Sequence, residues 1–111
     1  MRNEKCKMDY YCIVLTTCAS QEEADRIAGL LLEKRAVACV QMKPISSHYR
    51  WKGKIERAEE IHLLIKTTDA LYPQVESLIR EYHSYEVPQI VKVQITNGLK
   101  EYLDWISEET S

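Results

Sequence analysis

The sequence predicts an α+β fold in which two β-α-β units share one sheet. Apolar, strand-like runs alternate with segments whose apolar residues recur at helical spacing. A Lys52-Gly53 turn separates the second run from the third. Two segments, IVLTTCAS and LLIKTTDA, each end an apolar run in Thr-Thr before a helix start. This internal echo indicates two related half-domains.

Length and composition limit the class of protein. With 111 residues, 45% of them apolar and 29% charged, the chain predicts one globular domain over residues 10–111. The first nine residues, MRNEKCKMD, predict a short disordered tail rather than an export signal. A net charge of -2 argues against nucleic acid, and the absence of a long apolar run argues against a membrane span. The cysteines form no CxxC pair, which favours a reduced, cytoplasmic location.

The first half of the chain predicts strand, helix and strand. Residues 10–17 form a β-branched, apolar run of strand length. Ser20 and Glu23 then form the S-x-x-E pattern of a capping box at a helix start. Residues 36–42 predict the second strand. Pro44 cannot donate a ladder hydrogen bond, so it predicts an edge position or a bulge, and a bulge would shift the register beyond it.

The stretch from residue 49 to 68 predicts a long hairpin. Tyr49 and Trp51 precede the Lys52-Gly53 turn, and the returning strand is polar at first and apolar over residues 61–65. A two-residue loop places Tyr49 opposite Glu56. Such a strand is longer than the core of one small domain, so we expect its polar part to rest on another copy of the chain.

The second half repeats the pattern. Asp69 is predicted to cap a second helix with Pro73 in its first turn, and Ile90–Ile95 is the fourth strand, followed by a short final helix. The order β-α-β-β-α-β plus a C-terminal helix predicts the ferredoxin-like sandwich, with both main helices on one sheet face. The first and third strands are then central. The second and fourth are edges, which invite pairing with another chain.

Five motifs, in this order, closely resemble the CutA family of small proteins associated with tolerance to divalent cations. They are LLEKRAVACV (31–40), YRWKGKIE (49–56), EEIHLLIKTT (60–68), YHSYEVPQI (82–90) and EYLDWI (101–106). The resemblance covers residues 11–107. It implies a ferredoxin-like subunit in an interlocked homotrimer, similar in plan to PII-type signalling proteins. It also implies a cytoplasmic location in bacteria, binding of copper or other divalent cations, and no established enzymatic reaction.

The resemblance also implies a metal site, from which this chain departs. In the family, a cysteine ends the first strand and two adjacent histidines end the second helix. The matching residues here are Thr16, Tyr82 and His83, so one ligand of that set is kept. Many members carry a glutamate after the Val-Pro pair, where this chain has Gln89.

His83 is the first candidate for metal ligation, since imidazole binds soft and borderline cations. Cys18 or Glu86 is the expected second ligand. The alternative is that His83 hydrogen-bonds across a subunit boundary and shapes its turn. Cys18 precedes a helix N-terminus, so we expect a lowered thiol pKa there. Cys12 and Cys39 are expected to be small core residues.

A second group is expected at a cleft between subunits or as packing anchors of the trimer: Tyr49, Trp51, Glu56, Lys66 and Tyr85. Lys66 falls near the centre of the predicted sheet and therefore needs a carboxylate partner. Glu56 or Glu60, from the same or a neighbouring chain, is the expected partner.

The first functional hypothesis is a non-enzymatic homotrimer that binds divalent cations weakly and takes part in metal tolerance. The alternative is a PII-like regulatory or scaffolding module that binds a small anion or a partner peptide in its inter-subunit clefts, motivated by Lys54 and Lys66 beside Trp51. An enzyme of the acylphosphatase type is disfavoured, because TTCASQEEA after the first strand has no glycine or arginine. An RNA-binding role is disfavoured, because the central strands YCIVL and IHLLI lack a basic, aromatic surface.

Overall fold

The computed structural model describes residues 10–111, and the predicted disordered tail lies outside the described residues. Four strands form one sheet in the order β3-β4-β2-β5, with each neighbouring pair antiparallel. The strands are β2 (Tyr11–Cys18), β3 (Cys39–Trp51), β4 (Lys54–Thr68) and β5 (Ile90–Ile95). As predicted, the first and third of them are central and the other two are edges, which is the ferredoxin-like topology.

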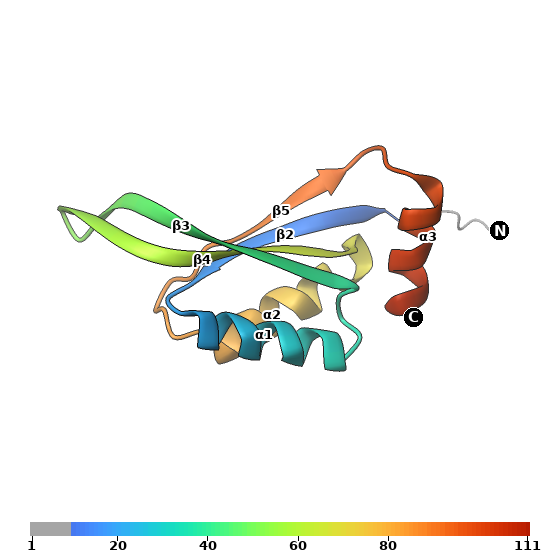
Figure 1. Ribbon diagram of the computed structural model, residues 1–111, viewed down its shortest axis with the longest axis horizontal. Coiled ribbons are helices and arrows are strands. Elements are labelled where there is room, and N and C mark those ends of the chain that lie inside the picture. Colours follow the sequence, from blue (N-terminus) through green and yellow to red (C-terminus); the bar gives the residue numbers. More distant parts are fainter. Residues whose placement is uncertain (1–9) are drawn as a thin grey trace.

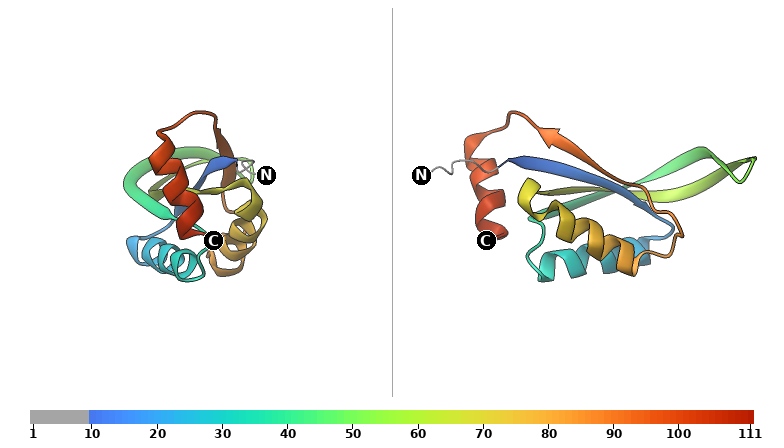
Figure 2. Two further views of the ribbon diagram at one scale, coloured as in Figure 1. Left: turned by 90° about the vertical axis from the view of Figure 1, so that its right-hand side faces the viewer. Right: turned by 180° about the vertical axis from the view of Figure 1, so that it is seen from behind.

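In the described residues, three α-helices accompany the sheet: α1 (Gln21–Glu33), α2 (Tyr72–Tyr82) and α3 (Lys100–Glu109). Helices α1 and α2 lie side by side beneath one face of the sheet, and α3 stands at one end of it (Figures 1 and 2). The core fills the space between the sheet and these two helices with fully buried side chains such as Val14, Ile27, Leu31, Leu63, Ile65 and Ile79. No helix in residues 10–111 is long and apolar enough to cross a membrane.

Only one of the two hydrogen bonds of the predicted capping box is present at the start of α1. The Ser20 hydroxyl accepts a hydrogen bond from the Glu23 N–H at 3.1 Å. The Glu23 carboxylate does not return to the Ser20 N–H. It accepts instead from the N–H of Ala19 at 3.1 Å and from the N–H of Ser84, beyond α2, at 2.7 Å. Glu23 therefore ties the first turn of α1 to the segment that follows α2.

The second strand differs from its prediction at both ends. It begins at Cys39 because residues 34–36 form the turn that ends α1, in which the N–H groups of Arg35 and Ala36 donate to the carbonyls of Leu32 and Leu31. It then runs through Pro44 to Trp51 in an uninterrupted register with β4, so the predicted alternative of a bulge is wrong. Pro44 lies on an edge strand, where a missing N–H removes no necessary ladder bond.

The β3-β4 hairpin projects beyond the rest of the sheet (Figure 1). Residues 61–66 of β4 pair with both β2 and β3, Thr67 and Thr68 pair with β2, and residues 54–60 pair with β3 alone. This two-stranded part, the hairpin arm, extends about 23 Å at 3.3 Å per residue. Lys52 and Gly53 at its tip have φ values of 51° and 81°, as a type I′ turn requires, and Tyr49 lies opposite Glu56 as predicted.

The segment before α2 corrects the predicted cap. Asp69 does not cap α2 but opens a short 3-10 turn, η1 (Asp69–Leu71), and α2 begins at Tyr72 with Pro73 in its first turn. The Asp69 N–H donates to the Tyr10 carbonyl at 2.9 Å, and its carboxylate lies 3.6 Å from the Lys92 ammonium. Asp69 therefore links this turn to the residue that precedes β2 and to Lys92 of β5.

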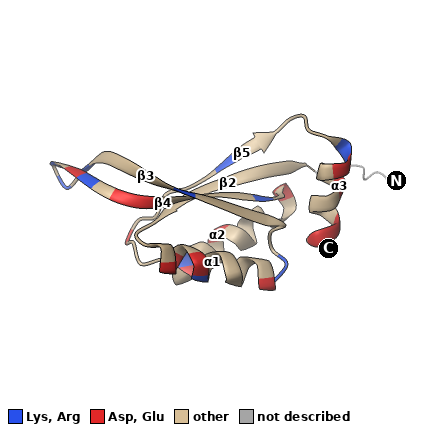
Figure 3. Ribbon diagram, viewed as in Figure 1, with Lys and Arg blue, Asp and Glu red and all other residues tan. Residues whose placement is uncertain are grey.

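The sheet face opposite α1 and α2 is largely apolar over β2 and β5 and carries His62 and Lys66 on β4. No helix of the described chain covers it (Figure 2). Its alternating side chains, here called the open face, include Ile13, Leu15, Leu64, Val91 and Val93. Val91 and Val93 are 45% and 47% exposed. Strand β2 carries no charged residue and β5 carries one lysine (Figure 3). A surface of this kind is typical of a contact with another protein chain.

Candidate functional site

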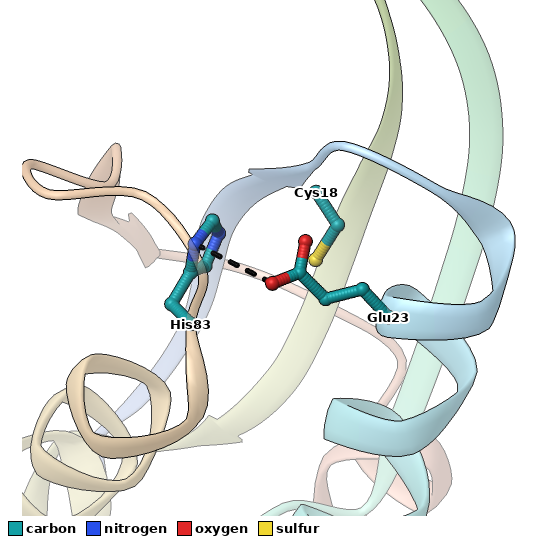
Figure 4. Close-up of side chains that lie close together, drawn as sticks. All are labelled: Cys18, Glu23 and His83. Atoms are coloured by element: carbon teal, nitrogen blue, oxygen red, sulfur yellow. Dashed lines mark ion pairs between the residues drawn. The ribbon is translucent and has the colours of Figure 1, made fainter.

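Three potential ligand groups converge where β2 ends and α1 begins. The donor atoms of Cys18, Glu23 and His83 all lie within 4.8 Å of one another. Cys18 ends β2, Glu23 lies in the first turn of α1, and His83 follows α2 directly, with the three side chains pointing toward one another (Figure 4). The sequence predicted Cys18 and His83. It missed Glu23, whose S-x-x-E pattern was interpreted as a cap, and the expected Glu86 is not in the cluster.

The His83 imidazole is held by a hydrogen bond at each ring nitrogen. Its Nε2 lies 2.6 Å from the Thr17 carbonyl oxygen, and its Nδ1 accepts from the Tyr85 N–H at 3.0 Å. Because a carbonyl can only accept, Nε2 carries the proton and the ring is neutral. Because both nitrogens are engaged in these hydrogen bonds, neither has a free lone pair, and the side chain is fully buried. The predicted structural alternative placed this hydrogen bonding across a subunit boundary, whereas it lies within one chain.

Glu23 provides the charge of the cluster. Its side chain is 5% exposed, and its Oε2 lies 3.9 Å from His83 Nδ1. Burial opposes ionisation, yet the hydrogen bonds from Ser84 and Ala19 outweigh it and hold the pKa of the Glu23 carboxyl below its usual value. The carboxylate is thus ionised at neutral pH and satisfied by two backbone donors.

The Cys18 thiol contradicts the prediction of a lowered pKa. Burial, reinforced by the neighbouring Glu23 charge, raises the pKa of Cys18 to about 12. The physical reason is that β2 extends through Cys18, so its side chain enters the core instead of an exposed loop at the helix N-terminus. Cys12 is buried in the core as predicted, while Cys39 is half-buried.

The other positions that the resemblance relates to metal ligands, Thr16, Tyr82 and Gln89, carry no thiol, imidazole or carboxylate. Thr16 is fully buried in the core, and its hydroxyl has no hydrogen-bond partner among the described residues. Tyr82 is 41% exposed at the end of α2. Gln89 is exposed and lines a groove on the outside of the molecule. The three ligand groups that do converge therefore form a different set from the family pattern described above.

That groove lies between the hairpin arm and the segment after α2, and its volume is about 740 Å³. We call it the hairpin groove; its lining includes Ser46, Tyr49, Trp51, Glu60, Tyr85 and Glu86. Three members of the predicted cleft group, Tyr49, Trp51 and Tyr85, thus come together. The other two, Glu56 and Lys66, are not part of its lining.

Lys66 lies far from the partners predicted for it. Its ammonium donates to the side-chain oxygen of Gln41 on β3 at 2.5 Å. Because Glu60 and Lys66 are six residues apart on one strand, about 20 Å separates them along β4. Glu60 bonds instead to the Tyr85 hydroxyl, which donates to its Oε2 at 2.7 Å. Burial and this hydrogen bond raise the pKa of Tyr85 well above its usual value.

The charges in the hairpin groove are acidic. Glu60 and Glu86 line it, and no lysine or arginine does. Lys54 and Lys66, the basis for expecting an anionic ligand, are both absent from the lining. The groove of this single chain therefore favours a cationic ligand over an anionic one.

The similarity of this chain to known proteins agrees with its fold and its motifs. Residues 12–109 match the family model described as CutA1 divalent ion tolerance protein. A divalent-cation tolerance protein CutA from Archaeoglobus fulgidus is 45% identical over 95 residues, covering 86% of this chain and 93% of the relative. The protein of the same name from Thermus thermophilus is 42% identical over 99 residues, covering 88% and 96%.

Solved structures agree in fold. That of the Archaeoglobus fulgidus protein, described as periplasmic, has a TM-score of 0.90 at 42% identity and covers 91% of this chain and 99% of its own. The CutA1 structure from Pyrococcus horikoshii has a TM-score of 0.87 at 34% identity, covering 90% and 98%. This sequence and structural similarity extends over nearly all of the described chain. The chain therefore belongs to the CutA1 divalent ion tolerance family.

Proposed function

We propose that this protein is a non-enzymatic, cytoplasmic homotrimer that takes part in divalent-cation tolerance and binds its cation weakly at Cys18, Glu23 and His83. The observation that carries the ligand assignment is the convergence of three donor atoms within 4.8 Å. Thiolate, carboxylate and imidazole together suit a borderline cation such as Cu²⁺ or Zn²⁺. Family membership supports the physiological role.

Cation binding should be weak because the cluster must first lose a hydrogen bond and a proton. The Tyr85 N–H has to leave His83 Nδ1 before that nitrogen can bind a cation. The Cys18 thiol has to lose a proton that burial retains. Glu23 keeps unused lone pairs beside its two N–H donors, so it can bind a cation without losing them.

Two surfaces of the single chain support the homotrimer. The hairpin arm is a two-stranded ribbon without a core of its own, and isolated ribbons of this kind are marginally stable in water. The open face exposes apolar side chains that a neighbouring subunit would cover. The alternative of a PII-like module with an anionic ligand has less support, because the hairpin groove is lined by carboxylates.

Calorimetric titration with Cu²⁺ and Zn²⁺ tests the ligand assignment. We expect lower affinity in Cys18→Ser, Glu23→Gln and His83→Ala, and unchanged affinity in Cys39→Ser, which removes a half-buried thiol outside the cluster. Equal affinities in all five proteins would contradict the assignment. Native mass spectrometry with and without copper tests the assembly: we expect a trimer in both conditions, and a monomer would contradict it.

A further inference from the structure

We propose that Tyr85 sets the cation affinity of the cluster of thiol, carboxylate and imidazole, because its backbone N–H occupies the position that a cation needs on His83. Cation binding and the hydrogen bond between Tyr85 and Glu60 then exclude each other. This inference rests on the ligand assignment proposed above. It adds a residue that is not itself a ligand and names the contact that cation binding would break.

Nδ1 is the nitrogen of His83 that is directed toward the other ligands. The Nε2 atom carries the proton and lies 2.6 Å from the Thr17 carbonyl oxygen, so it has no lone pair to offer. Nδ1 lies 3.9 Å from Oε2 of Glu23. Bonds from zinc to nitrogen and oxygen are about 2.0–2.2 Å long, so one cation fits between these two atoms and can bond to both. A cation would therefore bind His83 through Nδ1.

The Tyr85 N–H already fills this position. Its nitrogen lies 3.0 Å from Nδ1 of His83. A hydrogen bond of this length places the amide hydrogen about 2 Å from the acceptor atom. A zinc ion would lie about 2.0–2.1 Å from the same nitrogen. The amide hydrogen and the cation therefore compete for one lone pair at one distance, and the Tyr85 amide must move before Nδ1 can bind a cation.

The neighbouring Ser84 determines where this movement begins. Its N–H donates to Oε2 of Glu23 at 2.7 Å. A carboxylate has further lone pairs, so this bond can remain when Glu23 also binds a cation. Ser84 then stays attached to α1 while the next residue turns away. The displacement consequently begins between Ser84 and Tyr85.

The Tyr85 side chain links this displacement to the base of the hairpin arm. Its hydroxyl donates to Oε2 of Glu60 on β4 at 2.7 Å. Separations beyond about 3.5 Å are no longer hydrogen bonds, so a shift of the hydroxyl by about 1 Å breaks this contact. Cation binding thus costs the bond between Tyr85 and Glu60. Linkage requires the reverse as well: the bond lowers the affinity of the cluster for the cation.

Tyr85→Phe tests this exclusion without changing a charge or a ligand. The variant keeps the backbone N–H and the ring but cannot bond to Glu60. The cation-free state then loses a hydrogen bond that the cation-bound state never had. Calorimetry on the assembled protein should therefore show about tenfold tighter Zn²⁺ binding than in the wild type. Tyr102→Phe removes a tyrosine hydroxyl from α3, which contacts the opposite end of β2 through Tyr11, and should leave the affinity unchanged.

Amide hydrogen exchange, followed by NMR on the wild type with Zn²⁺, needs no substitution. Zn²⁺ should accelerate exchange of the Tyr85 N–H at least about tenfold, because its acceptor is taken. The Ser84 N–H should remain protected, because Glu23 still accepts from it. If Tyr85 only supported the fold, a bound cation would stabilise the folded state and slow the exchange of both amides.

The outcomes separate this inference from the ligand assignment. If Zn²⁺ does not bind saturably to the wild type, both are wrong. If the wild type binds Zn²⁺ and Tyr85→Phe binds it with equal or lower affinity, the inference alone is overturned, since the amide would then leave without moving the side chain. Continued protection of the Tyr85 N–H in the Zn²⁺-bound wild type would overturn it too.

Discussion

The Tyr85 N–H donates to Nδ1 of His83 at 3.0 Å, so one residue belongs to the wall of the hairpin groove and also fixes the imidazole of the cluster. The centroids of the His83 and Tyr85 rings lie 4.8 Å apart. Through this contact the metal cluster and the groove become neighbours that share one backbone segment. Occupation of His83 Nδ1 by a cation would release the Tyr85 N–H and thereby alter the groove wall.

His83 should stabilise the fold in the absence of metal. His83→Ala removes two hydrogen bonds and leaves the Thr17 carbonyl and the Tyr85 N–H unpaired, which should lower the free energy of unfolding by about 2–4 kcal/mol. Urea unfolding in EDTA measures this. His48→Ala, at an exposed position on the hairpin arm, should change it by less than about 0.5 kcal/mol. Similar stability of the two variants would show that His83 has no structural role.

Glu23 should make stability depend on pH in the acidic range. The pKa of its carboxyl is lower in the folded chain than the ordinary value of 4.5. The folded state therefore binds fewer protons, and this stability is complete above pH 4.5 and is lost as the pH falls through the folded-state pKa.

Glu23→Gln should consequently be less stable than the wild type at pH 7, with the difference shrinking toward pH 3. Urea unfolding at fixed protein concentration over this range is the measurement. Glu22→Gln changes an exposed neighbour in the same helix turn and should leave the pH dependence nearly unaltered. A difference in the free energy of unfolding between Glu23→Gln and the wild type that stays constant from pH 7 to pH 3 would refute the ionisation argument.

Substitution of Gly53 and of Gly29 by alanine should change the stability of the chain in opposite directions. Gly53 has a φ of 81°, so Gly53→Ala places a side chain in the left-handed region and should destabilise the chain by about 1 kcal/mol. Gly29 is exposed inside α1, with no atom within 4 Å of an added Cβ. Gly29→Ala should therefore stabilise the chain by about 0.5–1 kcal/mol. Thermal unfolding compares them, and shifts of the same sign would contradict the assigned turn geometry.

The open face should be required for assembly. Val93→Glu places a charge among apolar side chains of that face and should convert the proposed trimer to smaller species in native mass spectrometry. Leu32→Glu is the matched control, because Leu32 is also an exposed apolar residue, at 42%, but lies on α1. If both variants remain trimeric, subunits do not meet through the open face.

Features that depend on local chemistry could be predicted from the sequence. The Lys52-Gly53 turn fixed the hairpin register, and the Ser20 hydroxyl marked the start of α1, because each requires only nearby residues. The role of Glu23 could not be predicted in this way. Its contact with Ser84 spans 61 positions, and nothing local distinguishes it from an ordinary cap. The burial of Cys18 likewise depends on how far β2 extends before the chain turns.

The error over Lys66 has a different origin. Strand geometry alone places Lys66 about 20 Å along β4 from Glu60, so the sequence already contained the information against that pairing. The acidity of the groove, in contrast, arises from segments that meet only in the folded chain. Glu60 comes from β4 and Glu86 from the segment after α2, and their common position needs the tertiary structure.

The hairpin arm carries a consequence for the lifetime of the protein. Its residues 54–60 have a single neighbouring strand and are mostly exposed, so opening the ribbon disrupts little of the core. A free subunit would offer this ribbon to proteases while the sheet beneath it is still folded. At protein concentrations too low for the subunits to assemble, proteases would therefore cleave the chain at the tip of the hairpin arm. The length of the arm would thus couple the degradation rate of the protein to its concentration.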